Sequence, residues 1–428
     1  MLPFAHKHDL FDVPDSRLER DSRYKDAILR DNKADMQAMA PASLPSPDAQ
    51  SAAHSDRCAE FIRQKIRNSG GSISFAEYMH HALYAPELGY YTAGNTKFGA
   101  AGDFITAPEV SPFFGRILAR QCAVTLADMG QASLLELGAG SGRLAVDLLK
   151  KLDDLGALPK QYLILEVSAD LQQRQAAFMR EEIPMLFDRV SWVSELPKAH
   201  RGVVIANEVL DALPVERIVR RAEIQQQRVV INGNLFSIVE YTAPERLVAA
   251  VNEIEEDLGQ ALPEDYMSDV SLAGPRLVRD IVAALEAGVV FLFDYGVSRR
   301  EYYSAERSGG WLRCHFRHHA HNDPLILPGI QDLTAWIDFT AIANAATQAG
   351  ADVAAYVSQA IFMMSGGLEQ ELADIASLPQ KQQIELSAQV KMLTLPGQMG
   401  EHFKCLALRK GSAKSPSAFQ FADRTHTL

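Results

Sequence analysis

Leu134-Leu-Glu-Leu-Gly-Ala-Gly-Ser-Gly-Arg-Leu144 joins a run typical of a buried strand to a run with helical spacing. Glycines 138, 140 and 142 occupy the turn between the two runs. A ligand that lies across such a turn approaches the backbone closely, and a Cβ atom there would block it. We therefore expect a strand at Leu134–Leu137, a helix at Arg143–Leu155 and a ligand against the glycines.

Strands and helices continue to alternate beyond this turn. A helix is predicted at Asp170–Glu182, and buried strands are predicted at Tyr162–Val167, Val190–Val193, Val203–Ala206 and Val289–Phe293. Repeated βα units of this length predict an α/β fold, in which helices cover both faces of a parallel sheet.

The spacing of the glycines indicates which kind of nucleotide binds. In a dinucleotide fingerprint the third glycine follows the second by three positions, and here Arg143 stands at that position. This disfavours an NAD-dependent oxidoreductase. The GxGxG spacing, with Glu136 two residues before it, suits a ligand without a pyrophosphate that carries a positive α-amino group and a positive sulfonium. S-adenosylmethionine (SAM) is such a ligand.

The predicted cofactor contacts lie at the ends of the first two strands and in the turn after the first. They are Glu136, Gly138, Ala139, Gly140 and Gly142, together with Glu166 at the end of the second strand. An acid at that place in a doubly wound sheet accepts the ribose hydroxyls. The alternatives are a glycine turn that serves packing alone and a solvated carboxylate at the end of the strand.

Polar residues also follow the fourth strand. Asn207, Glu208 and Asp211 come just past Val203–Ala206, at the edge where open α/β sheets bind their ligands, and Asn207 is a further predicted cofactor contact. If a helical turn begins there, Glu208 and Asp211 share one face. Two carboxylates would grip a cationic acceptor such as a guanidinium, orient it and accept its proton. The alternative is an N-cap aspartate beside a surface glutamate.

The outer parts of the chain are assigned by composition and pattern. Residues 1–54 predict a disordered tail, and residues 55–130 a helical segment with a capping box at Ser74–Glu77. The core comprises 131–222 and 287–300. Residues 223–286 form an insertion, whose hairpin places Arg228–Ile231 and Leu235–Val239 around Asn232-Gly-Asn234. Residues 301–410 hold an acceptor-side loop, helices near 340–364 and 378–392 and a strand at Phe403–Leu408, before a tail at 411–428.

Composition restricts the partners. The net charge of −12 argues against nucleic acid, whose phosphates demand a basic surface. The four cysteines form no CxxC pair, which indicates a reducing compartment, and no apolar run is long enough to span a bilayer. The cytoplasm is the expected location. No pattern in the sequence assigns an oligomeric state.

Several motifs occur in order along the chain. They are Gly102-Asp-Phe-Ile-Thr-Ala-Pro-Glu-Val-Ser111, Leu135-Glu-Leu-Gly-Ala-Gly-Ser-Gly142, Asn207-Glu-Val-Leu-Asp-Ala-Leu-Pro214, Phe293-Asp-Tyr-Gly296, Pro328-Gly-Ile-Gln-Asp-Leu-Thr-Ala335 and Met399-Gly-Glu-His-Phe-Lys404. From about Ser74 to Leu408 the chain resembles the MidA-like family of class I SAM-dependent methyltransferases, which includes a mitochondrial complex I assembly factor that methylates an arginine of a core subunit. Two departures are Ala139, where the family commonly has proline, and Trp336, where histidine is frequent.

The resemblance implies a Rossmann-like methyltransferase sheet with an N-terminal helical segment, an insertion after strand four and a helical C-terminal part. It implies that Gly102–Ser111 covers the cofactor, with contacts from Thr106 and Pro108. It also implies a protein arginine acceptor on a respiratory complex I-type subunit, and the mitochondrial matrix as location if the source is eukaryotic. A small-molecule methyltransferase and a non-catalytic SAM-binding assembly factor are the other hypotheses.

The histidine-rich segment Cys314-His-Phe-Arg-His-His-Ala-His321 suggests a metal site at first sight. Its spacing fits no usual ligand pattern, and adjacent histidines seldom converge on one tetrahedral ion. We therefore expect no metal. The segment is predicted to be a loop, either near the acceptor, with His318 or His321 placed for proton transfer, or of structural importance alone.

Overall fold

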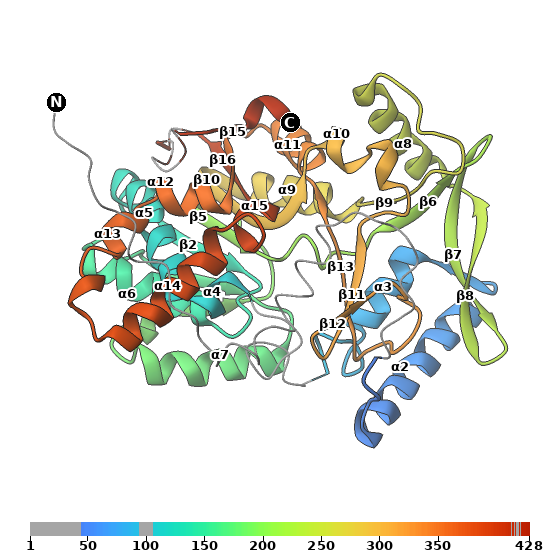
Figure 1. The fold of residues 1–428 in the computed structure, drawn as a ribbon, viewed down its shortest axis with the longest axis horizontal. Helices are drawn as coiled ribbons and strands as arrows, with labels where there is room; N and C mark the ends of the chain where they lie inside the picture. Colours follow the sequence, from blue (N-terminus) through green and yellow to red (C-terminus); the bar gives the residue numbers. More distant parts are fainter. Residues whose placement is uncertain (1–43, 94–105, 412, 415, 417–418, 420) are drawn as a thin grey trace. The chain divides into compact units, whose positions relative to one another are not determined.

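The computed structural model of the protein describes residues 44–93, 106–411, 413–414, 416, 419 and 421–428. Eight strands form its main sheet, and seven of them lie side by side in the order β15-β16-β10-β5-β2-β3-β4. Figure 1 labels β15, β16, β10, β5 and β2 of this sheet. Their bounds, in that order, are Asp352–Ser358, Phe403–Lys410, Leu285–Val297, His200–Asn207, Ser133–Leu137, Tyr162–Leu165 and Val190–Val193. The eighth, β14 (Ile337–Asp338), pairs with β10.

The five strands from β10 to β4 are parallel, as the sequence predicts. Only β16 runs against its neighbours, between β10 and β15. Because β2 lies between β5 and β3, the chain leaves β2 toward one side of the sheet and later returns to β5 on its other side. The turn after β2 therefore lies at the position where such sheets bind ligands.

Alternating side chains of the strands build two cores. In β10, Val289, Phe291 and Phe293 face one layer of helices, and Val290 and Leu292 face the other. The first layer contains α5 (Pro112–Met129), α6 (Arg143–Asp154), α7 (Ala169–Glu182), α12 (Gln359–Ser365), α14 (Gln380–Thr394) and α15 (Met399–His402). The second contains α9 (Ala273–Ala284) and α11 (Phe339–Gln348), which lie next to each other in Figure 1.

A second sheet joins the N-terminal segment to the middle of the chain. Its strands are β1 (Ser72–Ser74), β6 (Glu216–Arg220), β7 (Ile224–Asn232), β8 (Leu235–Thr242) and β9 (Met267–Val270), and all of its pairings are antiparallel. Helices α2 (Ala49–Asn68) and α3 (Phe75–Tyr84) pack on β7. Helix α8 (Glu245–Leu258) packs in a separate cluster with Ile218 of β6.

The histidine-rich segment is a hairpin. Strands β11 (Leu312–Phe316) and β12 (His319–His321) are joined by Arg317 and His318, both with positive φ, and β13 (Asp332–Ala335) pairs with the other edge of β11. The remaining helices of four residues are α4 (Ala107–Val110), α10 (Arg299–Tyr302) and α13 (Leu368–Glu371).

Several local predictions are confirmed. Ser74 and Glu77 form a complete capping box at the start of α3. The β7–β8 hairpin turns through Gly233 and Asn234, with Asn232 opposite Leu235. Helix α14 and strand β16 lie where their patterns place them.

The N-terminal helix begins earlier than expected. Helix α2 begins at Ala49, because the Asp48 carboxylate caps it by accepting a hydrogen bond of 2.9 Å from the Ser51 amide. Residues 49–54 therefore belong to a helix and not to the predicted tail. At the other end, Phe419 stacks near Phe291, and Asp423 accepts a hydrogen bond of 2.8 Å from the Tyr356 amide. These two residues of the predicted 411–428 tail pack on the core.

The predicted helix near 340–364 is wrong in its middle. Helix α11 ends at Gln348, and β15 follows from Asp352 to Ser358 before α12 begins. The alanines of this stretch fit helical spacing, but Ala355 and Val357 face one core while Val353 and Tyr356 face the other. Pairing with β16 decides between the two patterns. The expected insertion at 223–286 also differs, because α9 within it packs on the main sheet.

Candidate functional site

The glycine turn has the backbone conformation that only glycine adopts easily. Gly138, Gly140 and Gly142 have φ values of 63°, 54° and 85°. Gly138 is exposed, and a Cβ atom built on it would lie 3.3 Å from Val209. A Cβ atom on Gly142 would lie 2.9 Å from Met179 of α7. The surface of the turn at Gly138 is therefore open to a ligand, whereas Gly142 lies close to the side chain of Met179 in α7.

Helix α4 connects the glycine turn to the loop after β5. The hydroxyl of Ser141 donates to the carboxylate of Glu109. The backbone of Ala107 hydrogen-bonds to the carboxylate of Glu208. Of the residues expected to cover the cofactor, Thr106 is partly exposed at the start of α4 and Pro108 is buried. Gly102–Ile105, from the same motif, lie outside the described residues.

Glu166 lies one residue past β3 and is held in place. Its Oε1 accepts a hydrogen bond of 2.9 Å from the Ser168 amide, and its Oε2 accepts one of 3.2 Å from Gln175. Gln175 also donates to the carbonyl oxygen of Gly140 at 2.9 Å. One side chain of α7 thus connects the turn after β2 to the acid after β3. Sequence reasoning did not single out Gln175, which stands in a helical stripe with Leu171 and Met179.

Glu136 points into the core from β2. Its Oε2 accepts a hydrogen bond of 2.6 Å from the hydroxyl of Tyr162 in the neighbouring strand, and only 2% of the residue is exposed. Burial raises the pKa of Glu136 to about 7, and the Tyr162 hydrogen bond opposes part of that rise. Ala139 is also buried. Both residues are enclosed by the protein in this structure, and their contact with a cofactor stays a prediction.

The loop after β5 is not helical, so the condition under which Glu208 and Asp211 would share a helical face is not met. Glu208 has a φ of 53°, which a non-glycine residue seldom adopts. Its amide donates to the carbonyl oxygen of Phe293 at 2.8 Å, and Asn207 donates to its Oε1 at 3.0 Å. The contact with Phe293 of β10 and the one with Asn207 of β5 fix the direction of the loop. The carboxylates of Glu208 and Asp211 still lie close enough for the charge of Asp211 to act on Glu208.

Asp294, at the carboxyl end of β10, fixes this loop from below. Its Oδ2 accepts hydrogen bonds from the amides of Leu210 (3.0 Å) and Asp211 (3.2 Å), and its Oδ1 accepts one from the Tyr295 amide (3.0 Å). The Tyr295 side chain hydrogen-bonds to the carboxylate of Asp211. Asp294 therefore positions Asp211 through the backbone, and Tyr295 does so through the side chain.

Burial and crowding raise the pKa of these carboxyl groups. Burial raises the pKa of Glu208 to about 8, with a further contribution from Asp211. Burial raises the pKa of Asp211 to about 6, against the hydrogen bond from Tyr295. The pKa of Asp294 is raised by burial and by both neighbouring acids. Within the described part of the chain, no lysine or arginine forms an ion pair with Glu208, Asp211 or Asp294. Three acids without a cation are suited to a cationic ligand.

The N-terminal segment adds two tyrosines beside these acids. Tyr84 and Tyr91 stack with ring centroids 5.5 Å apart. The Tyr84 hydroxyl donates to the carbonyl oxygen of Ala212 at 3.0 Å, and the Tyr91 hydroxyl donates to Asp332 at 2.9 Å. From β13, the Ala335 amide donates to the carbonyl oxygen of Asp211 at 2.9 Å. Sequence reasoning missed these tyrosines, because nothing in the sequence around α3 indicates that it reaches the sheet edge.

A family model of S-adenosyl-L-methionine-dependent methyltransferases matches residues 117–357, which include the glycine turn, Glu166 and the loop after β5. The chain belongs to this family. The protein is a SAM-dependent methyltransferase, as the glycine spacing and the resemblance to the MidA-like family predict.

Known proteins agree with this assignment over most of the methyltransferase chain. A mitochondrial protein arginine methyltransferase NDUFAF7 homolog of Drosophila melanogaster is 31% identical over 398 residues, 85% of this chain and 88% of the fly protein. Mitochondrial NDUFAF7 of Homo sapiens is 28% identical and covers 81% of this chain and 82% of its own. A crystal structure of a methyl transferase superfamily member from Burkholderia thailandensis, bound to S-adenosyl-homocysteine, has 37% identity and a TM-score of 0.84. It covers 90% of this chain and 100% of its own.

The residues of the methyltransferase site fit SAM. The open backbone at Gly138 leaves room for the ligand, and Glu166 offers a carboxylate beside it. Asn207 and Asp211 each have a buried side-chain oxygen (Oδ1) without a hydrogen-bond partner. Unsatisfied acceptors at the carboxyl edge of the sheet are suited to a cationic, hydrogen-bonding ligand.

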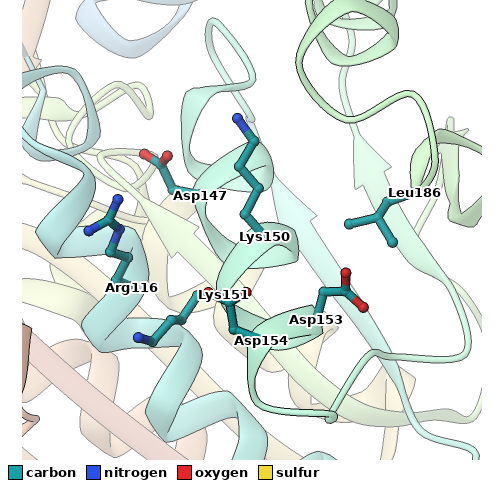
Figure 2. A pocket seen from close by; sticks show the side chains of 7 residues that line it. All are labelled: Arg116, Asp147, Lys150, Lys151, Asp153, Asp154 and Leu186. Atoms are coloured by element: carbon teal, nitrogen blue, oxygen red, sulfur yellow. The ribbon is translucent and has the colours of Figure 1, made fainter.

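A pocket elsewhere on the molecule does not belong to this site. Figure 2 shows it between α5 and α6, with Arg116 and Asp147 facing it from the two helices. Its other lining residues are Lys150, Lys151, Asp153, Asp154 and Leu186. Apart from Arg116 of α5 and Leu186, which follows α7, the lining residues lie on α6 beyond its first turn, and none of the predicted site residues is among them.

The histidine hairpin adjoins the strand that contacts the loop of Asp211. The amide of Ala335 in β13 donates to the carbonyl oxygen of Asp211, and β13 pairs with β11 of the hairpin. In the described residues, no group of three or more histidines, cysteines, aspartates or glutamates is arranged to hold a metal ion. Across the same residues, no helix has the length and apolar character needed to cross a membrane.

Proposed function

We propose that this methyltransferase methylates the guanidinium of an arginine in a protein, and that Glu208 and Asp211 bind that guanidinium. The observation that carries the proposal is the pair of adjacent carboxyl groups at the carboxyl edge of the sheet, with raised pKa values and no cationic partner among the described residues. In the proposed arrangement the cofactor lies across the ends of β2 and β3, against Gly138, Gly140 and Glu166.

The two acids have complementary chemistry for this task. A guanidinium is planar and always charged, and a carboxylate binds it in bidentate geometry. When bound, SAM supplies an electrophilic methyl group on a sulfonium. The acceptor nitrogen must lose a proton as it gains the methyl group. The positive charge of a bound guanidinium favours the ionised form of Glu208, and a carboxylate whose pKa is raised by burial is a stronger base than an ordinary glutamate, so it is suited to accept that proton. Asp294 and Tyr295 keep Asp211 in place.

Two further considerations support a protein acceptor. The fly and human relatives are named protein arginine methyltransferases and mitochondrial proteins. The second sheet and the helices α2 and α3 add surface beside the acids, more than a small substrate needs. We propose a subunit of the respiratory complex I type as acceptor. The proposed location is the cytoplasm of a bacterium or the mitochondrial matrix of a eukaryote.

Cofactor binding is tested by calorimetry with SAM, S-adenosylhomocysteine and NAD. We expect the first two to bind and NAD to fail, because Arg143 replaces the glycine that a pyrophosphate requires. Gly140→Val should abolish binding, through a side chain at the cofactor face and a φ of 54° that valine resists. Gly233→Val is the matched control, since Gly233 has a φ of 60° in open space at the tip of a hairpin. Equal binding by the wild type and Gly140→Val would contradict the site.

The acceptor is tested with isotope-labelled SAM and peptides that contain either arginine or lysine. We expect label in the arginine peptides, and a fall in kcat of about 10²–10⁴ in Glu208→Gln with little change in cofactor affinity. Label transferred only to small molecules would favour a small-molecule methyltransferase. Tight SAM binding without any transfer would favour a non-catalytic assembly factor.

A further inference from the structure

Gln175 is a fully buried amide on the apolar face of α7. Its exposed fraction is 0%, and it lies between Leu171 and Met179 in the stripe that packs on the core. A buried amide needs partners for its two N–H groups and its oxygen. The structure supplies all of these partners, and two of them belong to different halves of the cofactor site.

The orientation of the amide is fixed by Trp192 of β4. The indole N–H donates to the Oε1 of Gln175 at 2.8 Å, and an indole nitrogen can only donate. The Nε2 of Gln175 must therefore face the other way. There it donates to the carbonyl oxygen of Gly140 at 2.9 Å and to the Oε2 of Glu166 at 3.2 Å.

The two acceptors of Nε2, the carbonyl oxygen of Gly140 and the Oε2 of Glu166, both carry partial or full negative charge and would repel each other without a donor between them. The amide lies between them as a double donor, so the glycine turn and Glu166 are held at a fixed separation. We infer that Gln175 is a positioning residue of the cofactor site, which sets Glu166 against the glycine turn and is itself oriented by Trp192. This inference rests on the proposed cofactor site.

Substitutions of Gln175 separate positioning from packing. Gln175→Glu keeps the volume but places a carboxyl group between two acceptors, and its protonated form can donate only one hydrogen bond. Affinity for S-adenosylhomocysteine should therefore fall at least about tenfold at pH 8.5 and by less at pH 6. Gln175→Leu removes the donor without adding charge, so it should weaken binding with no such added dependence on pH. Gln173→Glu, on the exposed side of the same helix, is the matched control and should bind like the wild type.

The measurements are calorimetric affinities at both pH values and the Tm of each protein without ligand. Trp192→Phe, which keeps a ring but removes the indole N–H, supplies a third variant if Gln175→Glu fails to fold, and it should weaken cofactor binding by a smaller factor. If the wild type does not bind S-adenosylhomocysteine, the proposed cofactor site itself fails. If the wild type binds, and folded Gln175 and Trp192 variants bind equally well at both pH values with only a lower Tm, Gln175 is a packing residue and the inference is overturned.

Discussion

Glu208 combines two unfavourable features, a left-handed backbone and a partly buried acid. Its φ of 53° costs about 1–2 kcal/mol relative to an ordinary conformation. Burial raises its pKa to about 8, well above the ordinary value for a glutamate. The loop keeps this conformation because the amide of Glu208 is bonded to β10 and the amides of Leu210 and Asp211 are bonded to Asp294. Strain of this kind concentrates at functional sites.

The raised pKa of Glu208 predicts how stability depends on pH. Between about pH 4.5 and pH 8 the folded protein holds a proton that the unfolded chain has lost, so the free energy of unfolding falls as the pH rises through this window. Glu208→Gln removes this contribution. Its stability relative to the wild type should therefore increase from pH 5 to pH 8.5, by about 1 kcal/mol or more. Thermal denaturation at both pH values measures the difference.

Glu264→Gln, at an exposed position, controls for the loss of one negative charge. If the difference in stability between Glu208→Gln and the wild type is the same at both pH values, the raised pKa of Glu208 is contradicted. Glu208, Asp211 and Asp294 interact, so their carboxyl groups titrate together. We therefore expect kcat/KM to rise between about pH 6 and pH 8 as the three carboxyl groups ionise, and not to follow the pKa of one residue alone.

The sequence is enough to predict where the residues of the candidate site lie in the sheet, but not the backbone conformation of those residues. The rule that ligands lie at the carboxyl edge of parallel strands is enough to select Glu166, Glu208 and Asp211. The backbone of Glu208 depends on hydrogen bonds to Phe293 and on Asp294, which lie more than 80 residues away in the sequence. The role of Gln175 depends in the same way on Trp192, whose partner no local pattern reveals.

At the scale of elements, the parallel strands were predicted well, and the errors lie where a neighbouring strand decides the outcome. The central runs of β5 and β10, Val203–Ala206 and Val289–Phe293, are apolar throughout, as is typical of strands buried on both faces. Strand β15 could not be separated from helix by pattern, because its alanines fit both periods and pairing with β16 decided between them. The short strand β1 forms only because β7 is available as a partner.

Two glycines within strands are required by close contact between neighbouring backbones, which no pattern in the sequence predicts. Gly202 and Gly288 lie opposite each other in β5 and β10. A Cβ atom on Gly288 would come within 1.9 Å of the carbonyl oxygen of Gly202, and one on Gly202 within 2.0 Å of the carbonyl oxygen of Ser133. Gly288→Ala should therefore lower the free energy of unfolding by about 3 kcal/mol, because the strands must move apart.

Urea denaturation measures this loss. Gly233→Ala is the control, because Gly233 also has a positive φ but a Cβ atom added to it would meet no other atom within 4 Å. Its cost should be limited to backbone strain, about 1 kcal/mol. Equal losses in the two variants would show that backbone strain, rather than contact between the strands, explains both glycines.

At the scale of the described unit, the methyltransferase sheet and the added parts are joined by buried polar contacts as well as by apolar packing. Sequence patterns place α2, α3 and the β7–β8 hairpin in separate segments, but they form one cluster with β11 and β13. Cys58 and Ile62 of α2 and Val229 of β7 share this cluster. Local patterns cannot predict that these elements pack in one cluster, because each element is amphipathic and could pack on several partners.

Arg299 forms one of these polar contacts, and only 4% of it is exposed. Its Nε donates to Asp338 at 2.9 Å, and its guanidinium also pairs with Asp257 of α8. Asp338 in turn caps α11 by accepting a hydrogen bond of 3.1 Å from the Ala341 amide. The guanidinium of Arg299 thus links α8, in the insertion, to the start of α11, in the core.

Removing Arg299 should be costly, because it leaves the carboxylate of Asp338 buried without its cation. We expect Arg299→Met to lower the free energy of unfolding by about 3–5 kcal/mol. Arg276→Met, which breaks an exposed pair with Asp280, should cost less than about 1 kcal/mol. The double variant Arg299→Met/Asp338→Asn should recover part of the loss, because the amide can still cap α11 without a buried charge. Urea denaturation of the wild type, the two single variants and the double variant measures these losses. If the double variant is no more stable than Arg299→Met, the destabilisation comes from lost packing around the Arg299 side chain and not from the unpaired Asp338.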